Sequence, residues 1–212
     1  MGMTITEKIL ARASGKKKVT PGDVVNANVD IALAHDVTSD LAIDILLKDR
    51  GGKVWDPKRI IVLPAHGVPN KDIQVATMVK KLIDFARAQK IKHVYSIETG
   101  EYGVCHTMLP EEGHVRPGEV IVGADSHTCA HGSLGAFATG IGSTELGNVF
   151  GTGKLWFRVP ESVKIVVKGK FKKGVMAKDL ILKFIGDVGV DGCLYQAMEW
   201  TGPAITAMSI DE

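Results

Sequence analysis

Apolar and polar positions repeat with two different periods along the chain, and the switching between these periods predicts an α/β fold. Apolar runs or strict alternation between turn residues, the pattern of strands, occur in segments 24–33, 59–63, 92–97 and 119–122. Apolar side chains at every third or fourth position, the pattern of helices, occur in segments 39–48, 70–89, 144–150 and 178–188. Strands that alternate with helices favour a three-layer α/β/α domain with a largely parallel sheet.

Two local expectations concern individual side chains. Asp36 or Ser39 precedes the helical pattern at 39–48 and is expected to cap that helix. Trp156 and Phe157 follow a glycine-rich turn, and both are expected to lie in the core.

The composition of the 212 residues is that of an ordinary globular protein, with 45% hydrophobic and 24% charged residues. A net charge of +2 gives no field that would favour nucleic acid or a membrane as a partner. No apolar run is long enough to span a bilayer and no apolar signal core is present, so a cytoplasmic protein is expected. Cys105, Cys129 and Cys193 show no CxxC spacing, which favours reduced thiols.

The stretch 123–133 carries most of the candidate chemistry. It follows the fourth predicted strand directly and contains Asp125, Ser126 and His127, with His131 four residues on. Ligand sites in open α/β sheets lie at the carboxyl ends of strands. The same residues also suit a helix N-cap with a histidine that is merely satisfied, and the spacing alone leaves both interpretations open.

Three further histidines, His35, His66 and His106, also follow predicted strands. Because parallel strands end at one edge of a sheet, these imidazoles are expected to meet Asp125 and Ser126 around a single crevice. Such a set could donate hydrogen bonds to substrate oxygens in a hydro-lyase. The chain has no HExxH-like spacing of a zinc hydrolase, and adjacent residues cannot form a nucleophile triad. A non-catalytic binding module is the remaining alternative.

The stretch GADSHTCAHGSLGAFATGIGSTE resembles the DSHT signature of the aconitase superfamily, and HDVT at 35–38 and GVCH at 103–106 resemble further segments of it. Within the superfamily, the chain is similar to the isopropylmalate dehydratase and homoaconitase large subunits. The resemblance implies an aconitase-like N-terminal α/β domain over residues 1–212. It also implies that this domain is cut from a subunit about twice as long, and that the last ten or so residues begin the next segment.

The resemblance also implies a function. The parent enzyme is expected to be an iron–sulfur hydro-lyase that isomerises a hydroxy-polycarboxylate, namely 2-isopropylmalate to 3-isopropylmalate in leucine biosynthesis, with a separate small subunit as its partner. The alternatives are a homoaconitase large subunit acting on homocitrate and homoisocitrate, or a non-catalytic scaffold fragment. Residues that match family positions are expected to be catalytic (His66, His106, His127 and Asp125) or to bind the substrate (His35 and Ser126).

Two features depart from the family pattern. The relatives have aspartate before the histidine at 66, whereas this chain has Ala65, which cannot orient an imidazole. The chain is therefore catalytically impaired, or it has been altered, or another carboxylate takes the place of the missing aspartate. The SCTNGR and CxxC-like segments that supply cluster cysteines are also absent. A 4Fe–4S cluster is thus expected in the full-length protein, while this chain alone is expected to hold no metal and to be inactive.

Overall fold

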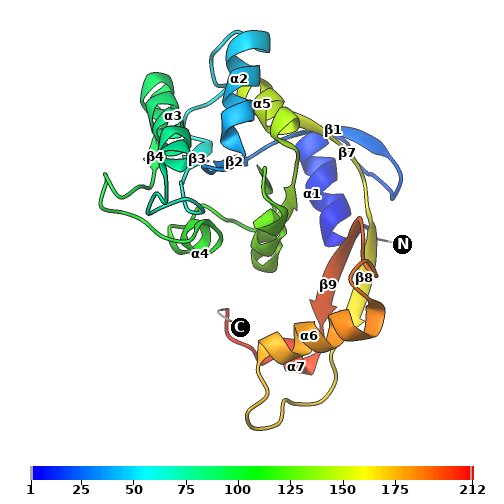
Figure 1. Cartoon of the computed structure of the whole chain (residues 1–212). Coiled ribbons are helices and arrows are strands. Elements are labelled where there is room, and N and C mark those ends of the chain that lie inside the picture. The colour runs from blue at the N-terminus through cyan, green and yellow to red at the C-terminus, as the bar shows by residue number, and fades with distance from the viewer. Residues whose placement is uncertain (1, 211) are drawn as a thin grey trace.

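Five short parallel strands form the central sheet in the computed structural model, which describes residues 2–210 and 212 (Figure 1). Their order across the sheet is β4-β3-β2-β5-β6. In chain order they are β2 (Ile31–Ala34), β3 (Ile60–Val62), β4 (His93–Val94), β5 (Val120–Gly123) and β6 (Phe137–Gly140). The predicted α/β fold with a largely parallel sheet is confirmed.

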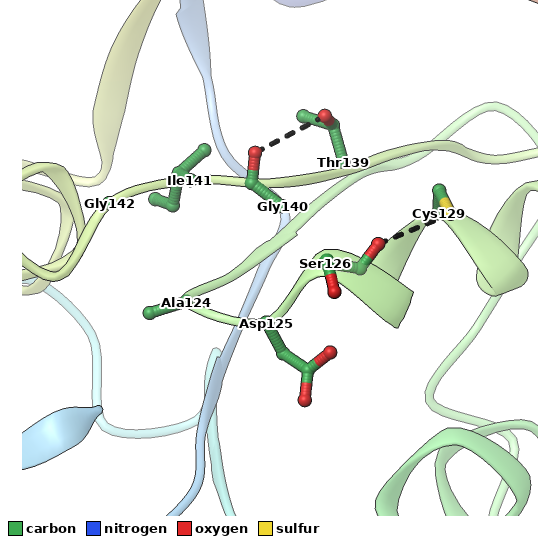
Figure 2. A pocket seen from close by; sticks show the side chains of 8 residues that line it. All are labelled: Ala124, Asp125, Ser126, Cys129, Thr139, Gly140, Ile141 and Gly142. Atoms are coloured by element: carbon green, nitrogen blue, oxygen red, sulfur yellow. Dashed lines mark hydrogen bonds between the residues drawn. The ribbon is translucent and has the colours of Figure 1, made fainter. Parts of the chain in front are cut away.

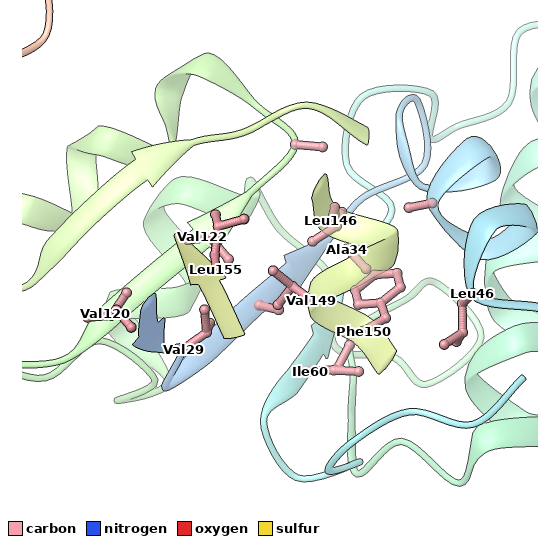
Figure 3. Close-up of a cluster of buried hydrophobic side chains, with 14 of the residues drawn as sticks. Val29, Ala34, Leu46, Ile60, Val120, Val122, Leu146, Val149, Phe150 and Leu155 are labelled. Carbon is pink, nitrogen blue, oxygen red and sulfur yellow. The ribbon is translucent and has the colours of Figure 1, made fainter. Parts of the chain in front are cut away.

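Helices cover both faces of this sheet, which gives the predicted three layers. Along β2, Ala32 and Ala34 belong to one core cluster and Leu33 to the other, because successive side chains of a strand point to opposite faces. Figure 3 shows the first cluster around Phe150, and Figure 1 shows α2 and α5 on the side opposite α4. The first cluster receives side chains from α1 (Ile5–Ser14), α2 (Ser39–Asp49), α3 (Ile73–Gln89) and α5 (Ser143–Thr152), and the second from α4 (Cys105–Glu111).

The single strand predicted over 24–33 is wrong, because the structure divides it between two sheets. β1 (Val24–Asn28) pairs antiparallel with β7 (Lys154–Arg158), whereas β2 belongs to the central sheet. The break falls at Asp30, whose carboxylate accepts the backbone N–H of Val120 at 2.9 Å and contacts Arg12 at 2.5 Å. These contacts hold the chain where it passes from one sheet to the other.

The prediction that Trp156 lies in the core is also wrong. Trp156 is 65% exposed, whereas its neighbour Phe157 is 7% exposed and packs in the first core cluster. Burial alternates strictly along β7, because the two faces of a strand differ with a period of two residues. Only one of two adjacent aromatic side chains can therefore face the core.

The cap predicted for α2 is wrong for a related reason. Thr38 is the N-cap residue and makes no side-chain capping bond, and the Asp36 carboxylate turns instead to the loop after β3. Because β2 and β3 are adjacent parallel strands, their following loops lie side by side. In that loop the Asp36 carboxylate accepts three backbone N–H groups, those of residues 65–67.

Residues 161–210 form a smaller unit away from the five-stranded sheet (Figure 1). Its strands β8 (Glu161–Val166) and β9 (Gln196–Thr201) pair in parallel, with α6 (Ala177–Val188) between them and α7 (Pro203–Thr206) after them. Glu199 Oε1 accepts the backbone N–H of Ile5 at 2.8 Å and so joins this unit to α1. Within the described residues, no helix combines the length and apolarity needed to cross a membrane.

Candidate active site

The loops after β2, β3 and β5 and the first turn of α4 meet at the carboxyl edge of the sheet. β2 leads to His35, β3 to His66 and β5 to Asp125, while His106 is the second residue of α4. β2 is paired with both β3 and β5, so their loops are neighbours in space although they are far apart in sequence. The convergence of these side chains that was expected from a parallel sheet therefore occurs.

Asp125 lies at the centre of this cluster. Its Oδ2 atom is 3.0 Å from His66 Nε2, 3.4 Å from His106 Nε2 and 3.8 Å from His35 Nε2. Its Oδ1 atom is 3.1 Å from His127 Nδ1. Four imidazoles thus surround one carboxylate whose side chain is only 6% exposed.

The two oxygens of the Asp125 carboxylate have different partners. Oδ1 accepts the backbone N–H of His127 at 2.7 Å, which makes Asp125 the N-cap of the 3₁₀ helix η1 (Ser126–Leu134). Oδ2 is left to face the imidazoles, so the capping and ligand-site interpretations of this stretch are compatible. Gly140 of β6 permits the close backbone approach here, because a Cβ atom at that position would lie 2.6 Å from the Asp125 carbonyl oxygen.

Asp36 is a second carboxylate of the site, and reasoning from the sequence missed it. Its buried side chain accepts the backbone N–H groups of Ala65 at 3.2 Å, of His66 at 3.1 Å and of Gly67. Its Oδ1 atom also lies 3.7 Å from His66 Nδ1 and 3.8 Å from His35 Nδ1. Burial raises the pKa of Asp36, but the His35 imidazole and the N–H groups hold it well below its usual value. The only signal in the sequence was its position beside His35.

Asp125 is ionised and His106 is neutral at pH 7. Burial raises the pKa of Asp125, but the His127 N–H and the nearby His106 imidazole lower it to about 2. Burial lowers the pKa of His106, although the Asp125 carboxylate opposes this effect. A neutral imidazole can therefore donate or accept a hydrogen bond beside a fixed negative charge.

His131 was noted in the sequence without a role, and the structure places it behind the cluster. It is fully buried, and neither ring nitrogen has a hydrogen-bond partner among the described residues. Its ring centroid lies 5.6 Å from that of His106. Burial and the neighbouring His106 lower its pKa to about 4, so a neutral ring packs against the site.

A hollow of about 440 Å³ opens beside the cluster, between the start of η1 and the end of β6 (Figure 2). Ser126 and Asp125 line it on one side. No histidine is among the described residues that line it. The His35 side chain is 3% exposed, and its Nε2 lies 2.9 Å from Thr38 Oγ1 and 3.2 Å from the Ala124 carbonyl oxygen. The two residues expected to bind substrate thus differ, with Ser126 accessible and His35 behind the imidazoles.

Two groups of three side chains could hold a metal ion, since their donor atoms lie within 4.8 Å of one another. Both groups include Asp125 and differ in their imidazoles. They are His35, His66 and Asp125, and His106, Asp125 and His127.

Cysteines contribute to neither group. Cys105 is buried, and burial raises its pKa to about 11. Cys129 is exposed on η1, and Cys193 lies in the smaller unit between α6 and β9. Iron–sulfur clusters need several thiolates around one point, so the cysteines of the described residues do not fit such a cluster.

Comparisons with known proteins agree with the fold and identify relatives of the chain. The model of the aconitase family (aconitate hydratase) matches residues 7–212. The 3-isopropylmalate dehydratase large subunit of Desulfatibacillum aliphaticivorans is 52% identical over 212 residues, which cover 100% of this chain and 50% of that protein. The corresponding subunit of Aquifex aeolicus is also 52% identical, over 100% of this chain and 48% of its own length. A probable 3-isopropylmalate dehydratase large subunit of Methanothermobacter thermautotrophicus is 50% identical, with 100% and 50% covered. The chain thus spans about half the length of the curated relatives it matches.

Proposed function

The chain belongs to the aconitase family, and we propose that it forms one wall of the active site of a hydro-lyase that interconverts 2-isopropylmalate and 3-isopropylmalate. The names of the relatives support this substrate. The observation that carries the proposal is the contact of Asp125 with the three imidazoles of His66, His106 and His127 at one edge of a parallel sheet. In this role the enzyme acts in the cytoplasm, in leucine biosynthesis.

His66 is the residue to which we assign proton transfer. Its side chain is 38% exposed and can reach a substrate, and its Nε2 atom lies beside the Asp125 carboxylate. In the dehydration direction the imidazolium protonates the leaving hydroxyl, while a base from the rest of the enzyme takes the proton of the neighbouring carbon. In the hydration direction both transfers are reversed, and the imidazole takes a proton from the water that adds. The negative charge of Asp125 stabilises the imidazolium while it exists.

The neighbouring residues position the substrate in this scheme. The neutral His106 donates a hydrogen bond to a substrate oxygen, and the exposed His127 does so from the other side of Asp125. Ser126 lines the hollow and can donate its hydroxyl to a substrate carboxylate. His35 lies behind them and supports His66 through a ring contact with a centroid distance of 4.5 Å.

The rest of the enzyme has to supply what these residues lack. Membership of the aconitase family implies an iron–sulfur cluster in the complete enzyme, where a bound cluster supplies a Lewis acid for the hydroxyl. The cysteines described above do not fit it, so its ligands are assigned to the other half of the large subunit. Among the described residues, those that line the hollow include no lysine or arginine. We therefore assign the cations that grip a polycarboxylate to that half and to a separate small subunit.

The test is an activity assay of the full-length large subunit, reconstituted anaerobically with its small partner. We expect turnover of 2-isopropylmalate, and we expect His66→Gln and His106→Gln each to lower kcat by about 10²–10⁴-fold, the usual contribution of a positioned acid–base group. His114→Gln is the matched control, because His114 is a partly buried histidine that bonds Tyr95 outside the cluster.

Two results would contradict the proposal. One is unchanged turnover in both His66→Gln and His106→Gln. The other is a preference of the wild-type large and small subunits for homocitrate over isopropylmalate. An iron–sulfur absorbance band in the 212-residue chain alone would contradict the assignment of the cluster ligands to the other half.

A further inference from the structure

We propose that Tyr102 is a positioning residue of the candidate active site, which holds the loop of His66 against the start of the helix that carries His106. The phenol hydroxyl of Tyr102 donates a hydrogen bond to the Val68 carbonyl oxygen at 2.6 Å. Val68 follows His66 by two residues, and Tyr102 precedes His106 by four. One side chain thus ties together the two segments from which these imidazoles project. The inference rests on the proposed function, because it takes both imidazoles to act on one substrate.

The loop between β3 and α3 is held differently in its two halves. In the first half, the Asp36 carboxylate accepts the backbone N–H groups of residues 65–67. In the second half, the bond from Tyr102 is the only hydrogen bond that residues 68–71 make with any described residue. The His66 side chain is 38% exposed, so packing alone does not fix its ring. The orientation of this ring therefore depends on how well both halves of the loop are held.

The segment that carries Tyr102 is a closed turn that leads directly into α4. Ser96 and Glu101 form an antiparallel bridge just before Tyr102. Val104 is the N-cap residue of α4, and its carbonyl oxygen accepts the backbone N–H of Met108 at 2.9 Å. Tyr102 therefore projects from a backbone that is fixed on both sides, and a bond to its hydroxyl can restrain the loop of another strand.

The two imidazoles meet at one carboxylate oxygen, which sets how accurately their segments must be placed. His66 Nε2 lies 3.0 Å and His106 Nε2 lies 3.4 Å from Asp125 Oδ2. In the described part of the chain, no second hydrogen bond joins the two segments, residues 64–69 and 96–106. A misplacement of a reacting group by about 1 Å can lower a rate by about 10²-fold. The tyrosine hydroxyl therefore acts on the reaction through the loop that it holds.

Tyr195 makes a hydrogen bond of the same kind elsewhere and provides a matched control. Its hydroxyl donates to the Arg158 carbonyl oxygen at 2.7 Å, and Tyr195 is 52% exposed, compared with 40% for Tyr102. Phenylalanine at either position removes one hydroxyl and one hydrogen bond and keeps the ring. Since both rings are partly exposed, neither variant should fail to fold. A merely structural role would make the two variants alike, whereas a positioning role separates them.

The first test measures turnover of 2-isopropylmalate by the full-length large subunit with its small partner. Tyr102→Phe should lower kcat about 3- to 10-fold, the factor that corresponds to one hydrogen bond, and should leave KM within about twofold of the wild type. Tyr195→Phe should leave kcat unchanged. Wild-type kcat in Tyr102→Phe would overturn the proposal. A raised KM at unchanged kcat would also overturn it, because the hydroxyl would then bind the substrate.

The second test follows hydrogen exchange in the 212-residue chain by NMR and needs no reaction. Tyr102→Phe should speed exchange of the backbone amides of His66 and Gly67 about 3- to 10-fold, because their loop opens more often. Tyr195→Phe should leave these amides unchanged. Equal exchange in Tyr102→Phe and the wild type would overturn the proposal. If the wild-type enzyme does not turn over 2-isopropylmalate, the proposed function fails, while the exchange rates still decide whether Tyr102 holds the loop.

Discussion

His66 lies between two carboxylates, with Nδ1 3.7 Å from Asp36 and Nε2 3.0 Å from Asp125. The resemblance to the family implies an acid at position 65, where this chain has alanine. Ala65 packs against the second core cluster and leaves its backbone N–H to Asp36. Asp36, from the loop after the neighbouring strand, thus holds the backbone N–H of His66 and lies within ion-pair distance of its ring.

Asp36→Asn should disturb the ring of His66 more than Ala65→Asp does. An amide cannot accept hydrogen bonds with the strength of a carboxylate, so we expect a changed His66 tautomer population, read from ring ¹⁵N shifts of the 212-residue chain. In the full-length enzyme, kcat should fall about 10- to 100-fold. Ala65→Asp should not raise turnover, and a clear gain would mean that Asp36 does not replace the missing acid.

His131 links the site to the acid stability of the protein. Its folded-state pKa is about 4, below the value of about 6.5 for an unperturbed imidazole. Between pH 6.5 and 4 the imidazole of His131 is protonated in the unfolded chain but not in the folded chain. The free energy of unfolding is therefore highest, as far as this group is concerned, above pH 6.5, and it falls as the pH is lowered toward 4. The lost stability is at most about 3 kcal/mol for this one group.

His131→Gln should accordingly flatten the dependence of unfolding free energy on pH between 6.5 and 4. Urea unfolding at several pH values measures it. His127→Gln is the matched control, because His127 lies four residues away on the same helix and its side chain is 79% exposed. The burial of His106 and His114 also lowers their pKa values, so some slope should remain. Equal slopes in wild type and His131→Gln would show that His131 does not carry this effect.

At the scale of elements, α5 holds the first core cluster together. Phe150 is fully buried near the end of this helix (Figure 3). Its ring stacks on Phe85 of α3, with ring centroids 5.7 Å apart. Its neighbour along the chain, β7, then turns Trp156 outward. Two aromatic residues only six positions apart thus differ completely in burial.

Phe150→Ala should lower the free energy of unfolding by about 3–5 kcal/mol, because it leaves a cavity in a packed core. Trp156→Ala, the matched removal of an exposed aromatic, should cost about 0.5 kcal/mol or less. Chemical denaturation followed by circular dichroism measures both. A similar loss of unfolding free energy in the two variants would contradict the outward orientation of Trp156 on β7.

At the scale of the whole molecule, burial is uneven. The two core clusters contain no residue beyond Val159 in the part of the chain that the structure describes. α6 has no buried residue, and Leu182 and Ile185 are 56% and 40% exposed. The smaller unit therefore has less packing to resist opening than the five-stranded sheet has.

Hydrogen exchange of backbone amides should separate the two parts. Amides of α6 and of β8 and β9 should exchange earlier than those of β2 and β5, because local opening is easiest where few apolar contacts are lost. Mass spectrometry of peptides from the 212-residue chain measures this. Equal protection of β5 and α6 would mean that the chain opens only as one unit.

The sequence by itself determined the class of fold and the positions of most helices, because these depend on periods of two and 3.6 residues that neighbours in sequence decide. It also placed His35, His66, His106 and Asp125 after strands, from which their meeting at one edge follows. Only the tertiary structure decided which partner each polar group takes. Asp36 could cap its own helix or reach the loop at Ala65, and the pairing of β2 with β3 settled that choice.

The same reason explains the other features that the sequence left open or predicted wrongly. The break at Asp30 and the outward turn of Trp156 depend on which strands pair, and the burial of His131 depends on what packs over η1. These contacts join residues far apart in the chain, and a local pattern of residues carries no information about them.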